Sequence, residues 1–224
     1  MSKNKCIVCN NTRNILVWND KIRTGQKNFS KRKYKIFKCT FCNLVFLKNK
    51  SKKLEDSSFT RNLYNKNNSI KEFFKFHTPR EIKKINFVKK YVNFRNKKIL
   101  ESNCGAGILI NHLKKKTKFT AGLDNVFYKN FVKSNNHDFY TSIDEIIKKK
   151  TQFDIILSFS EIEHKFDPIK FLKKIKKILS KNGKIILRVP NYFNFYMFLV
   201  GKNFLKYDYR QSHNYYFSEK NLDL

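Results

Sequence analysis

The sequence Lys98-Ile-Leu-Glu-Ser-Asn-Cys-Gly-Ala-Gly-Ile108 joins a short apolar run to a cluster of small residues. The run Lys98–Glu101 is typical of a strand that ends in an acid, and residues 108–116 have the apolar spacing of a helix. Between them, Gly105 and Gly107 permit a tight turn and let a ligand approach the backbone closely. A Gly-x-Gly turn is a weak signal by itself, so its meaning depends on the elements around it.

Short apolar strands alternate with lysine-faced helices on the C-terminal side of this turn. The run Phe153–Phe159 is almost continuously apolar, as expected for a strand that is covered on both faces. Strands are predicted at 98–101, 119–124, 138–141, 153–159 and 184–189, and helices at 108–116, after residue 124, and from Asp167-Pro168 through Leu179 to an end at Asn182-Gly183. This alternation predicts an α/β fold with a Rossmann-like, doubly wound and mainly parallel sheet.

On the N-terminal side, Thr78-Pro-Arg-Glu81 has the form of a helix start. Threonine is a good N-cap, proline suits the first helical position, and glutamate closes a capping box. The apolar residues that follow share one face of a helix: Ile82, Ile85, Val88 and Val92. We therefore expect a helix from residue 79 to about residue 93.

Two acids end neighbouring strands of the predicted sheet. Glu101 ends the first strand, and Asp124 ends the second strand 23 residues later. In open parallel sheets, the second acid is placed to accept hydrogen bonds from the ribose hydroxyls of a nucleotide-like cofactor. The sequence therefore predicts a cofactor site that includes Glu101, the glycine turn and Asp124.

Four of the five cysteines form two C-x-x-C pairs, which are Cys6/Cys9 and Cys39/Cys42. Four thiolates suit a tetrahedral zinc ion, and the ion would replace a core that about fifty residues cannot build alone. Disulfides and buried structural thiols are the alternatives, and the paired spacing favours zinc over both. Because the set leaves no open ligand position, we expect a structural Zn²⁺ and an extended hairpin between the two pairs.

The formal net charge of +32 raises the question of nucleic-acid binding. Only 8 of the 49 basic residues are arginine and the other 41 are lysine, and they are spread along the whole chain. Dedicated nucleic-acid surfaces use arginine for bidentate and stacking contacts. The composition therefore favours solvated lysine faces, which are typical of an AT-rich coding sequence, and no specific nucleic-acid partner is expected.

Over residues 75–224, the sequence resembles the class I S-adenosylmethionine (SAM)-dependent methyltransferases. Their glycine loop has the form acidic-x-Gly-x-Gly-x-Gly, which Glu101, Gly105 and Gly107 match, while Asn103 stands where the first glycine is usual. Asparagine tolerates a left-handed backbone, so the turn is expected to survive. The order of the downstream motifs strengthens the resemblance: Phe153-Asp-Ile-Ile156, Glu161-Ile-Glu-His164, Asp167-Pro168, Asn182-Gly-Lys184 and Val189-Pro-Asn191.

The resemblance implies SAM as cofactor and a role for each matching residue. Glu101 and the turn with Asn103, Gly105 and Gly107 would hold the methionine part, and Asp124 would bind the ribose. Residues 142–144 would face the adenine. In the branch that these motifs are typical of, an N-terminal four-cysteine module is common, and several members methylate sugars or nucleotide-linked deoxysugars. The family sheet has seven strands and the sequence accounts for five, so the sheet is expected to be incomplete at the C-terminal end.

His164 is the candidate for a catalytic base, because it follows the fourth strand at the carboxyl edge of the sheet. A neutral imidazole there can take a proton from a hydroxyl, or from a carbon beside a carbonyl, and Glu163 can orient the ring. The alternative is that both residues only shape the pocket. His213 is a weaker candidate, because its segment resembles one that approaches the substrate in the same branch.

These observations predict a zinc-ribbon-like module at 1–50, a linker at 51–77 and a methyltransferase domain at 78–224. We expect a small-molecule acceptor, a sugar or nucleotide sugar, with an RNA- or protein-directed methyltransferase and a non-catalytic zinc- and SAM-binding protein as the alternatives. The N-terminal residues do not resemble a signal peptide, and no apolar run approaches the ~20 residues of a membrane span. A cytoplasmic location is therefore expected, whereas the oligomeric state is not predicted.

Overall fold

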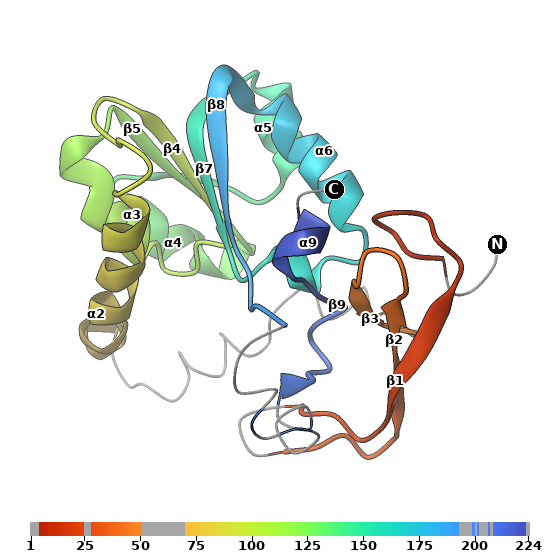
Figure 1. The fold of residues 1–224 in the computed structure, drawn as a ribbon. Coiled ribbons are helices and arrows are strands. Elements are labelled where there is room, and N and C mark those ends of the chain that lie inside the picture. Colours follow the sequence, from red (N-terminus) through yellow and green to blue (C-terminus); the bar gives the residue numbers. More distant parts are fainter. Residues whose placement is uncertain are drawn as a thin grey trace. The chain divides into compact units, whose positions relative to one another are not determined.

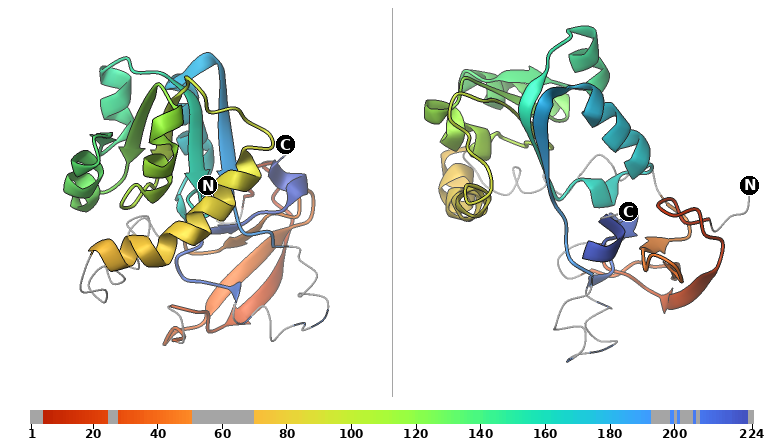
Figure 2. Two further views of the ribbon diagram at one scale, coloured as in Figure 1. Left: turned by 90° about the vertical axis from the view of Figure 1, so that its left-hand side faces the viewer. Right: turned by 45° about the horizontal axis from the view of Figure 1, so that its top comes forward.

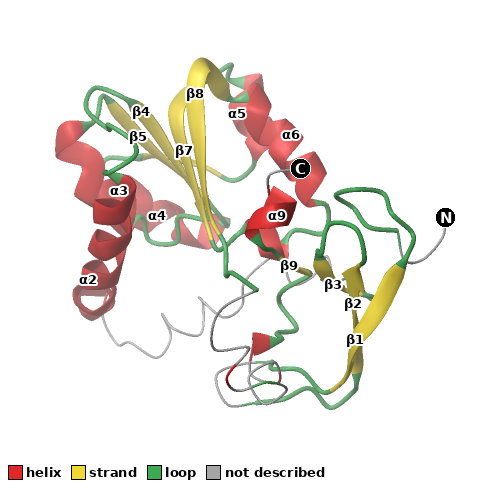
Figure 3. Cartoon of the chain, in the orientation of Figure 1, coloured by secondary structure: helices red, strands yellow, loops and turns green. Residues whose placement is uncertain are grey.

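The computed structural model describes residues 5–24, 28–50, 70–192, 199, 201, 206 and 208–222. The chain divides into two compact units (Figures 1 and 3). The cysteine unit comprises Met1–Ser57, Ile162–Phe171 and Val189–Leu224, and the sheet unit comprises Ser58–Glu161 and Leu172–Arg188. Most of the predicted linker, residues 51–69, lies outside the described residues, and the domain boundaries at 50 and 78 stay a prediction.

The sheet unit is built on five parallel strands in the order β6-β5-β4-β7-β8. The prediction of a Rossmann-like α/β fold is confirmed. The order reverses between β4 and β7, which makes the carboxyl edge of these strands the place where ligands bind in open α/β sheets. The strands are β4 Lys98–Ser102, β5 Phe119–Leu123, β6 Asp138–Tyr140, β7 Phe153–Phe159 and β8 Leu179–Arg188.

Helices cover both faces of this sheet (Figure 2). On one face, α2 and α3 pack on β4 and β7 through a cluster that includes Ile85, Leu109 and Leu157. On the same side, α4 buries Val132 beside Ile110 and Phe139. The helices are α2 Ile70–Val88, α3 Ile108–Leu113, α4 Lys129–Ser134, α5 Ile143–Lys148 and α6 Pro168–Lys177, with short 3₁₀ turns at Lys114–Lys116, Val126–Tyr128 and Ile162–His164.

The predicted start of the helix before β4 is wrong. Helix α2 begins at Ile70, and Pro79 lies inside it. A proline in a helix interior removes one backbone hydrogen bond and crowds the preceding turn. The additional turns place the half-buried Phe74 against Ala106 and Ile108, and this burial favours helix over the local start signal.

The predicted end of the fourth helix is also wrong. Helix α6 ends at Lys177, and Leu179 pairs with Phe153 as the first residue of β8. Gly183 allows the register shift that follows, because a Cβ at this position would lie 2.9 Å from the Phe153 carbonyl oxygen. Leu179 has the right spacing for the helix face, but strand pairing determines its conformation.

The cysteine unit has an antiparallel sheet in the order β1-β2-β3-β9. Its strands are β1 Asn14–Asp20, β2 Tyr34–Cys39, β3 Val45–Leu47 and β9 Tyr215–Tyr216, and a short helix, α9 Glu219–Leu222, follows. The pairing of β1 with β2 confirms the expected hairpin between the cysteine pairs. Tyrosines dominate its core, in which the hydroxyls of Tyr192 and Tyr209 are 2.7 Å apart.

The sheet unit contains a buried histidine that makes its stability depend on pH. His137 Nδ1 lies 2.6 Å from Thr120 Oγ1. Burial, and then the charge of Lys114, lowers the pKa of His137 to about 4. In the unfolded chain, the histidine side chain has its ordinary pKa near 6.5. As the pH falls, the unfolded state therefore takes up the proton before the folded state does. The effect of His137 on the free energy of unfolding is constant above about pH 6.5, and this free energy decreases as the pH drops towards 4.

We therefore expect His137→Gln to weaken the acid sensitivity of the protein. Between pH 7 and pH 4.5, the free energy of unfolding of the wild type should fall by about 2–3 kcal/mol more than that of the variant. Urea unfolding at the two pH values measures the difference. His112→Gln is the control, since His112 is exposed. Equal losses in the wild type and His137→Gln would contradict the prediction.

None of the described helices has both the length and the apolar character that a membrane crossing requires.

Candidate cofactor and acceptor sites

Three left-handed residues shape the turn between β4 and α3. The φ angles are 60° at Asn103, 52° at Gly105 and 74° at Gly107. Asn103 thus adopts the backbone that a glycine would have, as the sequence predicts. A Cβ at Gly105 would meet no atom within 4 Å, so the space beside this backbone is open. At Gly105, the turn therefore presents backbone without side-chain cover near the carboxyl edge of β4.

Asp124 holds this turn from the neighbouring strand. Its Oδ2 accepts the backbone N–H of Gly105 at 2.7 Å, and its Oδ1 accepts the N–H of Asn125 at 2.6 Å. The sequence places these residues on different strand ends, and the fold brings them into direct contact. The acid next to the turn is thus fixed in position by two backbone donors.

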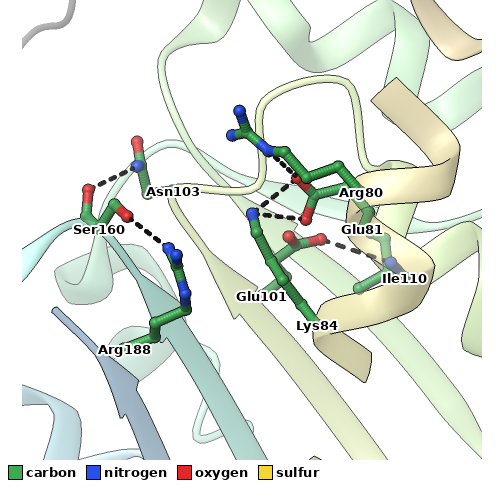
Figure 4. Close-up of polar contacts among 8 residues, drawn as sticks. All are labelled: Arg80, Glu81, Lys84, Glu101, Asn103, Ile110, Ser160 and Arg188. Atoms are coloured by element: carbon green, nitrogen blue, oxygen red, sulfur yellow. Dashed lines mark hydrogen bonds and ion pairs between the residues drawn. The ribbon is translucent and has the colours of Figure 1, made fainter. Parts of the chain in front are cut away.

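Glu101 is buried beneath the turn (Figure 4). Its Oε2 accepts the backbone N–H of Ile110 at 3.4 Å, in the first turn of α3. Burial, and then the negative charge of Glu81, raises the pKa of Glu101 well above its usual value. Lys84 offsets part of this effect, although its ammonium is already 2.6 Å from Glu81. Glu101 therefore keeps affinity for a proton or for a hydrogen-bond donor.

The four cysteines of the two pairs converge in the cysteine unit. The Sγ atoms of Cys6 and Cys42 are 3.6 Å apart, those of Cys9 and Cys39 are 3.5 Å apart, and all four lie within 4.8 Å of one another. A tetrahedral zinc with ~2.3 Å bonds to sulfur separates its ligands by about 3.8 Å. None of the four forms a disulfide. Their arrangement fits a four-thiolate zinc ion.

Glu163, His164 and His213 form a second cluster in the cysteine unit. One ligand atom from each residue lies within 4.8 Å of the others. The two imidazole rings pack edge to face, and their centroids are 4.8 Å apart. His164 Nδ1 lies 2.7 Å from the Ser212 carbonyl oxygen. A carbonyl can only accept, so Nδ1 carries a proton, and in the neutral ring Nε2 then has the lone pair. Spacing of this kind suits proton transfer, and also a divalent ion.

Backbone contacts bring the two halves of this cluster together. Asn214 donates its N–H to the Glu163 carbonyl oxygen and its amide to the His164 carbonyl oxygen, both at 2.8 Å. Burial, and then the nearby His164, lowers the pKa of His213 well below its usual value. His213 is therefore neutral at physiological pH.

Residues 73–224 match a family model described as a methyltransferase domain. The chain belongs to this family. A ubiquinone biosynthesis O-methyltransferase of Pelagibacter ubique is 28% identical over 149 residues, which cover 63% of this chain and 57% of the relative. A tRNA U34 carboxymethyltransferase of Campylobacter fetus is 28% identical over 113 residues, covering 46% of this chain and 40% of the relative. The chain spans about half the length of the curated relatives it matches.

A solved structure also resembles this chain. It is a SAM-dependent methyltransferase of Thermotoga maritima, described as a possible histamine N-methyltransferase. The two share 20% identity with a TM-score of 0.53, and the match covers 74% of this chain and 75% of that one. At this level of identity, the likeness establishes the fold.

A further acid at the strand ends of the methyltransferase domain has no role in the sequence-based prediction. Glu161 is buried, and its two carboxylate oxygens accept the hydroxyls of Ser102 at 2.9 Å and Ser158 at 2.6 Å. It thus ties the carboxyl ends of β4 and β7 together. The signal was a serine at the end of each of two neighbouring strands, followed by an acid.

The region expected to face the adenine has local structural roles. Ser142 caps α5 by accepting the Glu145 N–H at 3.2 Å, and Asp144 pairs with Lys174 at 2.6 Å. Neither contact tests the expectation, which stays a prediction.

Each cysteine pair is followed by an asparagine that the sequence analysis did not use. Asn10 and Asn43 both have a φ of 62°, and each donates its N–H to the carbonyl of the first cysteine in its pair, at 3.0 and 3.1 Å. The repeated pattern Cys-x-x-Cys-Asn thus encodes two matching turns. Such turns pre-form the thiol positions of both pairs.

Proposed function

We propose that this protein transfers a methyl group from SAM to a small-molecule acceptor, a sugar or a nucleotide sugar. The observation that carries the proposal is the left-handed turn at residues 103–107, at the carboxyl edge of β4. It has open space beside Gly105, and Asp124 accepts its backbone N–H. Membership of the methyltransferase family supports the same reaction. The cysteine module beside such a domain favours a sugar acceptor, by its resemblance to the sugar-methylating branch.

In this proposal, the predicted cofactor residues bind different parts of SAM. Asn103, Gly105 and Gly107 supply backbone groups, and Glu101 offers a buried acceptor for the ammonium of the methionine part. Asp124 accepts hydrogen bonds from the ribose hydroxyls. Bound SAM supplies an electrophilic methyl group, and the residues of the chain orient it and exclude water.

His164 takes the proton from the acceptor at Nε2 as the methyl group is transferred. The Ser212 carbonyl fixes the tautomer through Nδ1, and Glu163 stabilises the imidazolium that forms. The neutral His213 ring, 4.8 Å away, fixes the orientation of His164. The zinc ion at Cys6, Cys9, Cys39 and Cys42 would be structural and take no part in the reaction.

Titration with SAM tests the proposed function. The wild type should bind SAM with micromolar affinity, and Asp124→Ala should bind it about 10- to 100-fold more weakly, because the ribose and the Gly105 N–H both lose their acceptor. Calorimetry of the zinc-loaded protein gives both dissociation constants. Asp138→Ala, which removes an exposed acid of β6, should retain wild-type affinity. Absence of SAM binding by a folded wild type would make the chain a non-catalytic relative.

An acceptor screen then separates the small-molecule reaction from the RNA-directed alternative, which the tRNA-modifying relatives and the net charge of +32 favour. We expect turnover with a nucleotide sugar, and no turnover with tRNA. Methylation of tRNA with a steep dependence on salt would instead favour the alternative.

A further inference from the structure

One arginine lies at the carboxyl edge of the parallel sheet, at the end of β8. Arg188 is the last residue of β8, and it pairs with Phe159 at the end of β7. These strands lie on the other side of the switch point from Asp124 and β5. In a doubly wound sheet, a cofactor held on the β4–β5 side leaves the β7–β8 side for the second ligand.

A row of hydrogen bonds connects Arg188 with the glycine turn (Figure 4). The Arg188 Nη1 donates to Ser160 Oγ at 3.2 Å, and the Ser160 N–H donates to the Arg188 carbonyl oxygen at 2.7 Å. Asn103 donates its amide to the Ser160 carbonyl oxygen at 3.4 Å. Ser160 has a left-handed φ of 52°, a conformation that costs free energy and is found at functional sites. Ser160 therefore links the guanidinium to the turn through hydrogen bonds.

Most N–H groups of the Arg188 guanidinium have no acceptor within the described ranges. A guanidinium has five N–H donors, and one of them bonds Ser160. Among the residues that the structure describes, Arg188 forms no ion pair, and its side chain is exposed. In the sheet unit, the nearby Glu161 is occupied by two serine hydroxyls. No acid in the described part of the chain thus pairs with the Arg188 guanidinium.

The type of this residue also carries information. Lysine outnumbers arginine 41 to 8 in this chain, so composition alone would place a lysine at this strand end. Arginine differs from lysine in its planar fork, which binds both oxygens of a phosphate or carboxylate. We infer that Arg188 forms an oxyanion subsite that binds a phosphate or carboxylate group of the methyl acceptor. The inference rests on the proposed function, because it treats the anion as part of the acceptor.

Binding of model anions to the zinc-loaded full chain, saturated with S-adenosylhomocysteine, tests the subsite. The probes are uridine diphosphate for a phosphate, succinate for a carboxylate and uridine as the uncharged control. Arg188→Gln should weaken binding of at least one anionic probe by about tenfold and leave that of uridine unchanged. Arg188→Lys, which keeps the charge without the fork, should lose about threefold.

Lys184→Gln is the matched control, because it removes one exposed positive charge from the same strand. It should change the affinity for the anions by less than about twofold. Equal losses in Arg188→Gln and Lys184→Gln would overturn the subsite, since they would reflect net charge alone, and so would wild-type protein that binds neither anion. SAM titrations of the same variants separate the two proposals: anion binding that depends on Arg188 without SAM binding would retain the subsite and reject the methyltransferase.

Discussion

Removal of zinc is expected to unfold the cysteine unit. A four-thiolate zinc site contributes about 10–16 kcal/mol of apparent binding free energy in small domains, which is as large as the whole ~5–15 kcal/mol that stabilises a typical protein. Strong chelation, or Cys39→Ser, should therefore reduce the zinc content from about one ion per chain to near zero and abolish the cooperative melting of this unit. Metal analysis and thermal unfolding measure the two effects.

The fifth cysteine provides the control for this experiment. Cys104 is buried in the sheet unit, and its Sγ lies 2.6 Å from where a Cβ on Gly122 would be. Cys104→Ser should retain the zinc content of the wild type, because its thiol is not part of the cysteine cluster. A chelated protein that keeps the wild-type melting curve would show that the four thiols are merely buried neighbours.

Replacement of His164 is expected to have the second largest effect. If Nε2 takes the proton of the acceptor, His164→Asn should lower kcat by about 10²- to 10⁴-fold and leave the affinity for SAM unchanged. Asparagine retains a donor that reaches towards the Ser212 carbonyl oxygen, so the local backbone should be preserved. Steady-state kinetics with the acceptor found in the screen, together with a SAM titration, give both quantities.

Two comparisons make this result specific. His112→Asn changes an exposed histidine of α3 and should retain wild-type kinetics. His164→Gln, whose amide cannot take the proton of the acceptor, should lower kcat as His164→Asn does. A variant with unchanged kcat and raised KM would assign His164 to shaping the pocket, as in the alternative to catalysis.

The strongest local signals in the sequence predicted the sheet and its glycine turn. A run such as Phe153–Phe159 has few structural options, and Asn103 at a glycine position indicated a left-handed backbone that the structure has. The start of α2 and the assignment of Leu179 to a helix were mispredicted, because contacts with residues distant in sequence determine both. Helix propensity and capping signals depend on residues that are neighbours in sequence. The early start of α2 instead depends on the burial of Phe74 against a loop about thirty residues away.

The candidate sites were predictable to the same extent. Residue chemistry and spacing predicted that the four cysteines cluster, and the order of acids predicted that Glu101 and Asp124 lie at the glycine turn. Their roles in binding stay predictions. The contact between Gly105 and Asp124, and the bonds of Glu161 to two serines, depend on strand register. The same holds for His213, whose neighbour Asn214 bonds the carbonyls of Glu163 and His164 from a segment about fifty residues later.

The pairing of β3 with β9 has a consequence for protein synthesis. Val45 pairs with Tyr216, so the cysteine unit joins a strand to a partner that leaves the ribosome much later. The last strand of the sheet unit, β8, ends at Arg188 and emerges earlier. Non-local pairing waits for both partners, whereas the β1–β2 hairpin needs only local contacts. A nascent chain is therefore expected to pair its five described parallel strands before β9 joins β3.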